Sequence, residues 1–287
     1  MLTFAAATWA LAAAGDVVGR ASASELIGRG DGDATLQVNG AGQAHVSWHT
    51  DGGTRHLVAW SAINARPPTR GVPQVSFELR YRDRTIPAAR CGRYDGPPLA
   101  WLVSACKAAD GSYWALQRWQ RLKPNYGGQR GTWELRLSHW AGPLPQLEVW
   151  TDWAYRRFDH LYGRLTYGGK PVHGFRVTPQ GSPLDDYGRN IYVDTFNSRY
   201  GPGWRRENSF LAQRPNGAFC YGFYPHGNRP SGEGRRYRAT VIGPGVTPDV
   251  MWQGSPPGPY DAARDRQASD HQRQIFAGSS GNGCKPL

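Results

Sequence analysis

The chain has 287 residues, enough for one large domain or two ordinary ones, and its 34 Lys and Arg against 22 Asp and Glu give a net charge of +12. Aromatic residues make up 12% of the chain, too many for a protein that is disordered throughout. Beyond the N-terminal segment, no apolar run approaches the roughly 18 residues of a membrane-spanning helix. The 37 Gly and 22 Pro also speak against an all-helical bundle. Composition therefore bounds the class of protein but names no biochemical function.

The first residues are typical of a secretory signal peptide. Residues 2–15 are apolar and rich in Ala, and Ala21-Ser22-Ala23 forms the small-residue pattern after which a signal peptidase cuts. No Lys or Arg precedes the apolar stretch, so an ordinary N-terminal helix and a start codon assigned too far downstream are the alternatives. We expect residues 1–23 to be a signal peptide, and the mature chain to be secreted or associated with the cell envelope, with no integral membrane span.

The four cysteines agree with export. They are Cys91, Cys106, Cys220 and Cys284, and none lies in a C-x-x-C pair, so the spacing favours disulfides over a zinc site. Four cysteines allow three pairings, and proximity in the sequence favours Cys91–Cys106 and Cys220–Cys284. Four free thiols in a cytosolic protein are the alternative.

Alternating apolar and polar residues between turn signals predict a chain of short strands. A three-strand meander is expected over residues 34–38, 43–50 and 55–62, because Asn39-Gly40 and Asp51-Gly52 are strong hairpin turns. Other predicted strands cover residues 76–82, 99–105, 112–122, 133–139, 146–153, 161–167, 171–178, 190–196, 218–224, 237–242 and 250–252.

Strands of this length and spacing indicate an all-β protein with two packed antiparallel β-sandwich-like domains. We place a Trp-rich β domain at residues 24–157 and a β-sandwich domain at residues 158–258, followed by a helix and tail at residues 259–287. The single predicted helix covers residues 261–277, with Asp261 as its N-cap and Gly278 as its C-terminal stop.

One segment of the second half resembles a known family. Gly169-Lys170-Pro171-Val172-His173-Gly174, followed by Asp186-Tyr187-Gly188, is similar to the opening strands of carboxypeptidase-regulatory-like and Cna B-type domains. The resemblance covers residues 161–196 and implies a seven-strand β-sandwich that serves as a spacer, stalk or binding module and is not itself catalytic. Lys170 lies in a turn and residues 250–252 contain no Asn, so the Lys–Asn crosslink of some of these domains is not expected.

Signatures of the common enzyme classes are missing from the sequence. It contains no H-E-x-x-H, G-x-S-x-G or Walker A motif, and no G-x-G-x-x-G behind a strand, so we assign no catalytic residue and no cofactor. His45 and His49 are four apart on a strand, too far for routine co-ligation of a metal. Turn chemistry explains Asp31-Gly32-Asp33 and Asp185-Asp186 better than a calcium loop does, so no metal site is predicted.

Arginine and tryptophan are the residues from which we expect binding. All but four of the 34 basic residues are Arg, whose planar fork pairs with carboxylate or phosphate and stacks on aromatic rings. Trp140 and Trp204 are adjacent to turn residues and are expected to be exposed platforms for sugar rings. The alternatives are that Trp fills the core and that Arg only replaces Lys on solvated faces. The predicted ligand-binding residues are Trp140, Trp204, Arg205, Arg206, Arg236, Tyr237 and Arg238.

These observations favour a non-catalytic exported protein that associates with the cell envelope or binds an anionic or glycan surface, such as an acidic polysaccharide or a cell-wall polymer. The alternative is a polysaccharide lyase or glycosidase on a β-sandwich scaffold, which requires Tyr or His, Arg and a carboxylate to converge in one groove. Nucleic acid is not an expected partner, because no basic helix or aromatic ribonucleoprotein motif is present.

Overall fold

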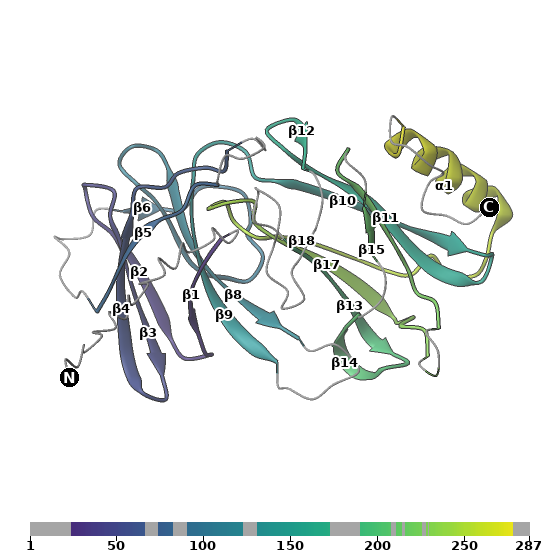
Figure 1. Ribbon diagram of the computed structural model, residues 1–287, viewed down its shortest axis with the longest axis horizontal. Coiled ribbons are helices and arrows are strands. Elements are labelled where there is room, and N and C mark those ends of the chain that lie inside the picture. Colours follow the sequence, from purple (N-terminus) through teal and green to yellow (C-terminus); the bar gives the residue numbers. More distant parts are fainter. Residues whose placement is uncertain are drawn as a thin grey trace, which may run out of the picture.

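The computed structural model describes residues 24–66, 74–82, 91–122, 131–172, 190–207, 211–213, 216–225, 228 and 230–277. These residues form four antiparallel sheets and one C-terminal helix, which confirms the predicted all-β class (Figure 1). Several predictions lie outside the described residues: the signal peptide at 1–23, Gly278, Cys284, and the part of the family resemblance that includes His173, Gly174, Asp186 and Gly188.

The first sandwich consists of two sheets that enclose an aromatic and aliphatic core. Alternation places Trp114, Leu116, Leu135 and Leu137 on the inward face of one sheet, opposite residues such as Leu57 of the other. One sheet has the order β1(Glu25–Arg29), β9(Thr132–Trp140), β8(Tyr113–Arg121), β7(Leu102–Lys107), β6(Gly92–Arg93), and the other β2(Ala34–Val38), β3(Ala44–Thr50), β4(Gly53–Trp60), β5(Glu78–Tyr81). The predicted meander is therefore confirmed, with β5 added at its edge.

The second sandwich follows the same plan with a different core. Leu161, Val193, Phe219, Phe223 and Tyr237 are buried between its sheets. One sheet has the order β10(Gln146–Ala154), β11(Phe158–Tyr167), β16(Ala218–Gly222), β15(Leu211–Gln213), with β12(Lys170–Pro171) paired to β11, and the other β14(Gly201–Arg206), β13(Asn190–Ser198), β17(Arg236–Ile242), β18(Val250–Gly254).

The change from the first core to the second comes earlier in the chain than the sequence suggested. β10 and β11 form one antiparallel hairpin paired from Gln146–Thr166 to Ala154–Phe158, so the predicted boundary at residue 157 falls inside its turn. Val149 of β10 packs in the second core, whereas Leu137 of β9 packs in the first. The two cores therefore separate between Trp140 and Gln146.

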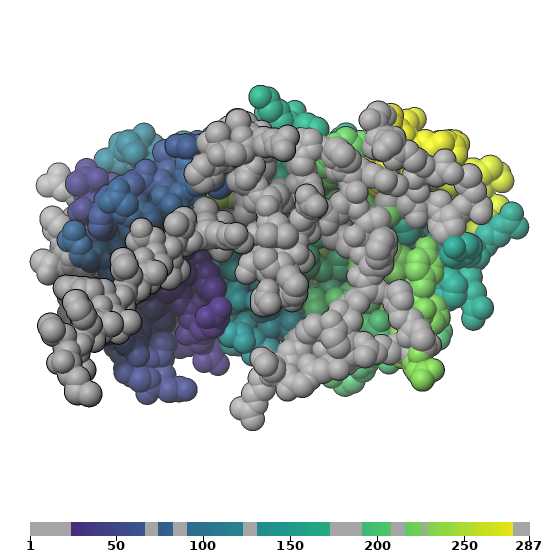
Figure 2. Space-filling view, in the orientation of Figure 1, coloured from purple at the N-terminus to yellow at the C-terminus, as the bar shows by residue number. Residues whose placement is uncertain are grey.

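The helix α1 (Ala262–Ile275) packs on the outer face of the β10–β11–β16 sheet, at the end of the molecule away from the first sandwich (Figures 1 and 2). Its N-cap is Asp261, as predicted, which accepts hydrogen bonds from the N–H groups of Ala263 and Arg264. Ile275 and Phe276 bury their side chains against Tyr162. Among the described residues, no helix has the length and apolar character needed to cross a membrane.

The predicted Cys91–Cys106 disulfide is present, and it closes a loop with a sequence separation of 15. Cys106 belongs to β7 and Cys91 immediately precedes β6, so the bridge fixes the edge of the first sandwich. Cys220 is buried beside α1. Because Cys284 lies outside the described residues, the Cys220–Cys284 pairing stays a prediction.

Candidate functional site

A cavity of about 710 Å³ opens at one end of the first sandwich. It forms where the inward face of the β2–β5 sheet leaves the core. Val46 and Leu57 pair within the core, and in the next inward-facing pair of the same ladder Trp48 is still a core residue, whereas its partner Arg55 is exposed. The residues lining the cavity are Gly28, Arg29, Trp48, Thr50, Thr54, Arg55, His56, Tyr81 and Arg82.

Trp48 is the aromatic floor of the cavity. Its side chain is only 6% exposed, and the indole lies directly against Gly28 of β1. A Cβ at position 28 would fall 2.7 Å from the indole Cε2 and Nε1 atoms, so only glycine allows the two sheets to approach this closely. Tyr81, which is 51% exposed, adds a second aromatic ring to the lining.

Three arginines surround the cavity, and none of the described residues that line it is acidic. Arg29, Arg55 and Arg82 are exposed, and none of the three forms an ion pair with any residue in the described part of the chain. Arg82 has a positive φ of 70°, and its backbone N–H donates to the carbonyl oxygen of His56 at 2.9 Å. The cavity is therefore cationic, and its guanidinium groups are available to an anion.

His56, which lines the cavity, forms a pair with His45 on the neighbouring strand of the same sheet. The His56 ring stacks on the His45 ring with centroids 5.4 Å apart, and His56 Nδ1 lies 3.3 Å from His45 Nε2. Hydrogen bonding between the two rings makes one of these nitrogens a donor and the other an acceptor, which fixes the orientation of His56. Among the described residues, no group of three His, Cys, Asp or Glu side chains is arranged to hold a metal ion.

The cavity contains part of the arrangement that a lyase would need. Tyr81, His56 and the arginines are present, but the described part of the lining contains no carboxylate. Burial and the nearby Glu25 both raise the pKa of Tyr81, which opposes its use as a proton-abstracting base. Burial also raises the pKa of Glu25 to about 7, against the opposing effect of Arg136. This lining suits recognition of an anion better than proton abstraction.

Four of the seven ligand-binding residues predicted from the sequence are buried. The expected exposure of Trp140 is wrong: its side chain is 0% exposed, because its ring packs against Tyr94 and Tyr113. Tyr237 is also 0% exposed, and its hydroxyl donates to Asp159.

Arg206 and Arg238 form a buried ion-pair network on one carboxylate. Arg206 Nε lies 2.5 Å from Asp194 Oδ1, and Arg238 lies 2.6 Å from Asp194 Oδ2. The Arg206 guanidinium also lies 5.2 Å from the Trp119 ring and 4.5 Å from the Tyr192 ring. Trp119 belongs to the first sandwich and Tyr192 to the second, so these arginines join the two sandwiches.

The other three predicted residues remain at the surface. Trp204 is half-buried, and Arg205 and Arg236 are exposed. The structure stacks Arg236 over Phe196 at 4.5 Å and over Trp204 at 5.7 Å, while Arg238 covers Trp204 at 4.3 Å. Sequence reasoning thus found one Arg–aromatic surface, whose role in binding stays a prediction.

Sequence reasoning missed the cavity and also a buried Asp–His pair. His160 Nδ1 lies 2.6 Å from Asp152 Oδ1, while His160 Nε2 has no hydrogen-bond partner within the part of the chain that the structure describes. His160 is only 1% exposed, so a substrate has no access to that nitrogen. For the cavity, a signal did exist: Arg55 of β4 lies in the same inward phase as Leu57 and Ala59, and a charge in that phase marks the open end of a sandwich.

The chain matches no known protein family, no curated protein and no solved structure. Its function is therefore argued from the geometry of the cavity and from the charges around it.

Proposed function

We propose that this is an exported binding protein that holds an anionic saccharide, a sugar ring carrying carboxylate or phosphate, in the cavity at the end of the first sandwich. The observation that carries the proposal is a cavity of about 710 Å³ whose described lining holds three arginines without an ion pair and no acidic residue. Small-molecule sites typically span about 300–1,000 Å³, so a cavity of this size suits one or two sugar units.

The residues that line the cavity suit both the anionic group and the sugar ring of such a ligand. The guanidinium fork of Arg29, Arg55 or Arg82 pairs in bidentate fashion with carboxylate or phosphate oxygens. Tyr81, which is half-exposed, presents its ring to the apolar face of a sugar, and the largely buried Trp48 indole supplies an apolar floor. The net charge of +12 further draws anionic polymers toward the protein.

Two observations support export. The sequence begins with a segment typical of a signal peptide, and the Cys91–Cys106 disulfide is of the kind that persists in oxidising compartments. Export would bring the protein to the cell envelope, where acidic polysaccharides and phosphate-containing polymers are found.

Calorimetric titration of the purified protein tests the proposal. Three ligands of matched length are needed: a uronic acid oligosaccharide, a glycerol phosphate oligomer and a neutral oligosaccharide. We expect one of the anionic oligomers, and not the neutral one, to bind. The double variant Arg55→Gln with Arg82→Gln should lose at least about tenfold in affinity, since each charge-assisted contact contributes roughly 1.5–3 kcal/mol.

The matched control is the double variant Arg205→Gln with Arg236→Gln, which removes the same charge from the Trp204 surface. Equal binding of all three ligands contradicts the proposal, and so does a loss of binding confined to the control variant, which would move the site to the Trp204 surface. Appearance of unsaturated products from the uronic acid oligomer would show lyase activity instead of binding alone.

A further inference from the structure

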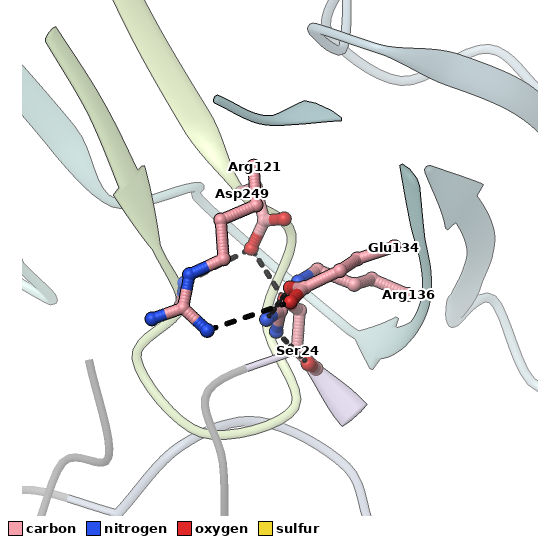
Figure 3. Close-up of polar contacts among 6 residues, drawn as sticks. Ser24, Arg121, Glu134, Arg136 and Asp249 are labelled. Carbon is pink, nitrogen blue, oxygen red and sulfur yellow. Dashed lines mark hydrogen bonds and ion pairs between the residues drawn. The ribbon is translucent and has the colours of Figure 1, made fainter. Parts of the chain in front are cut away.

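A buried polar network surrounds Ser24, which follows the predicted signal-peptidase pattern Ala21-Ser22-Ala23. The Ser24 hydroxyl donates to Asp249 Oδ1, and its backbone nitrogen donates to the carbonyl oxygen of Gly245. Arg136 donates to the Ser24 carbonyl oxygen at 2.8 Å. Figure 3 shows these side chains converging between the strands of the first sandwich and the loop before β18.

Among the buried members of this network, the charges do not balance. Its fully buried members are two carboxylates, Glu134 and Asp249, and a single guanidinium, that of Arg136, which lies 2.5 Å from Glu134. Arg121 lies 3.8 Å from Glu134 but is half-exposed, and Glu25 adds another carboxyl near Arg136. Asp249 Oδ2 accepts no hydrogen bond from the described part of the chain, although Asp249 is 0% exposed. A buried carboxylate oxygen without a donor calls for a cation beside it.

The backbone conformation of Ser24 also indicates where this cation could come from. Its φ of 35° lies in the left-handed region, a backbone conformation that residues other than glycine rarely adopt. φ is a torsion about the N–Cα bond that includes the carbonyl carbon of the preceding residue, so the strain exists only while residue 23 is attached. Removing that residue abolishes the strain and converts one amide N–H into an ammonium group with three donors.

We propose that the chain is cut between Ala23 and Ser24, and that the new α-ammonium group of Ser24 folds into this network as the buried counter-charge of Asp249. Water adds across the peptide bond: the C–N bond breaks, Ala23 leaves as a carboxylate, and the Ser24 nitrogen takes up protons to become an ammonium ion. This inference rests on the export that the proposed function assumes.

The location of Ser24 also sets the order of events. Ser24 is 0% exposed, so the bond before it is protected from a protease once the protein has folded. Cleavage therefore precedes folding, as it does for a signal peptidase that acts during translocation. The folded state then favours the cut chain, because only the cut chain supplies the ammonium group.

The test compares three forms of the protein made without export: one that starts exactly at Ser24, the same form acetylated on its α-amino group, and one that retains Ala23. We expect the form that starts at Ser24 with a free α-amino group to be the most stable of the three. Its unfolding equilibrium constant in denaturant titrations near neutral pH should be at least about tenfold smaller than that of either other form. In an Asp249→Asn background this advantage should fall below about twofold, whereas Asp51→Asn, an exposed control, should leave it intact.

A second measurement covers the case in which Asp249→Asn does not fold. In the otherwise unchanged protein, the Ser24 α-amino group should react with an acylating reagent at least about tenfold more slowly in the folded state than in denaturant. Mass spectrometry of the full chain exported by a bacterial host should give a mature protein that starts at Ser24.

Equal stability of the three forms overturns the inference, as does a fast-reacting amino group or a mature chain that starts at any other residue. Saccharide binding by the form that starts at Ser24 is measured separately, so failure of the proposed function remains distinguishable from failure of this inference.

Discussion

The indole of Trp48 and the backbone of Gly28 touch across the two sheets of the first sandwich, and a Cβ on Gly28 would fall 2.7 Å from the indole. Trp48 therefore keeps its position only because β1 carries no side chain there. The contact links the packing of the sandwich to the shape of the cavity, since both residues line it.

Gly28→Ala should displace the Trp48 indole and reduce both stability and binding. Overpacking of this kind costs about 1–3 kcal/mol, and the displaced ring should lower saccharide affinity about tenfold. Chemical denaturation and calorimetric titration measure the two effects. Gly92→Ala is the control, because a Cβ at that position meets only an ordinary contact at 3.6 Å. Wild-type stability and affinity in Gly28→Ala would show that the cavity floor is not set by this contact.

Binding in the cavity should weaken as salt is added. Arg55 is exposed, so its interaction with an anionic ligand is screened by mobile ions. Affinity should fall steadily between about 50 mM and about 500 mM sodium chloride, and Arg55→Gln should give a shallower dependence. Titrations across this range measure the slope, with Arg205→Gln as the exposed control of equal charge. A slope that Arg55→Gln leaves unchanged would remove Arg55 from the site.

Strands with clean alternation were predictable from the sequence, and strands that contain glycine or proline within a broken pattern were not. Residues 133–139 alternate apolar and polar side chains, and β9 covers them as Thr132–Trp140. By contrast, β1 (Glu25–Arg29) and β14 (Gly201–Arg206) were not expected, because Gly28 interrupts one pattern and Gly-Pro-Gly begins the other. Propensity disfavours these segments, and pairing to a neighbouring strand overrides it.

The cavity depends on contacts that are distant in the sequence, and local patterns do not encode them. Gly28 pairs with Leu135 of β9, and Tyr81 pairs with Leu57. Only these pairings bring Gly28 and Tyr81 to the same end of the sandwich. The exposure of Trp140 was mispredicted for a similar reason: a turn follows it, but Tyr94 and Tyr113 cover its ring.

Asp194→Asn should destabilise the protein strongly, because it leaves Arg206 and Arg238 buried without their shared counter-charge. Removing one partner of a buried ion pair costs about 3–5 kcal/mol. Both guanidiniums lie near the contact between the sandwiches, at Trp119 and Trp101. Denaturant unfolding measures the loss. Asp270→Asn, which breaks an exposed pair with Arg273, should change stability by less than about 1 kcal/mol. Equal effects of the two variants would show that burial adds nothing to the Asp194 network.

Glu207 should make the protein less stable as the pH rises from about 5 to about 7. Its carboxyl is buried and accepts hydrogen bonds from Thr195 Oγ1 at 2.8 Å and from the Tyr221 hydroxyl at 3.2 Å. Burial outweighs these bonds and raises the pKa of Glu207 to about 7, from 4.5 for the free side chain. Between these values the folded chain keeps the proton that the unfolded chain releases, so stability falls by up to about 3 kcal/mol and then levels off.

Glu207→Gln removes this titration and should flatten the fall in stability between about pH 5 and about pH 7. The remaining slope should come from other buried carboxyls such as Asp159, whose pKa burial raises to about 6. Unfolding curves at several pH values measure the profile. Glu148→Gln is the control, because Glu148 is 41% exposed and paired with Arg164, and its profile should follow the wild type. A Glu207→Gln profile parallel to the wild type would mean that Glu207 is ionised in the folded protein, which would require a cation beside it.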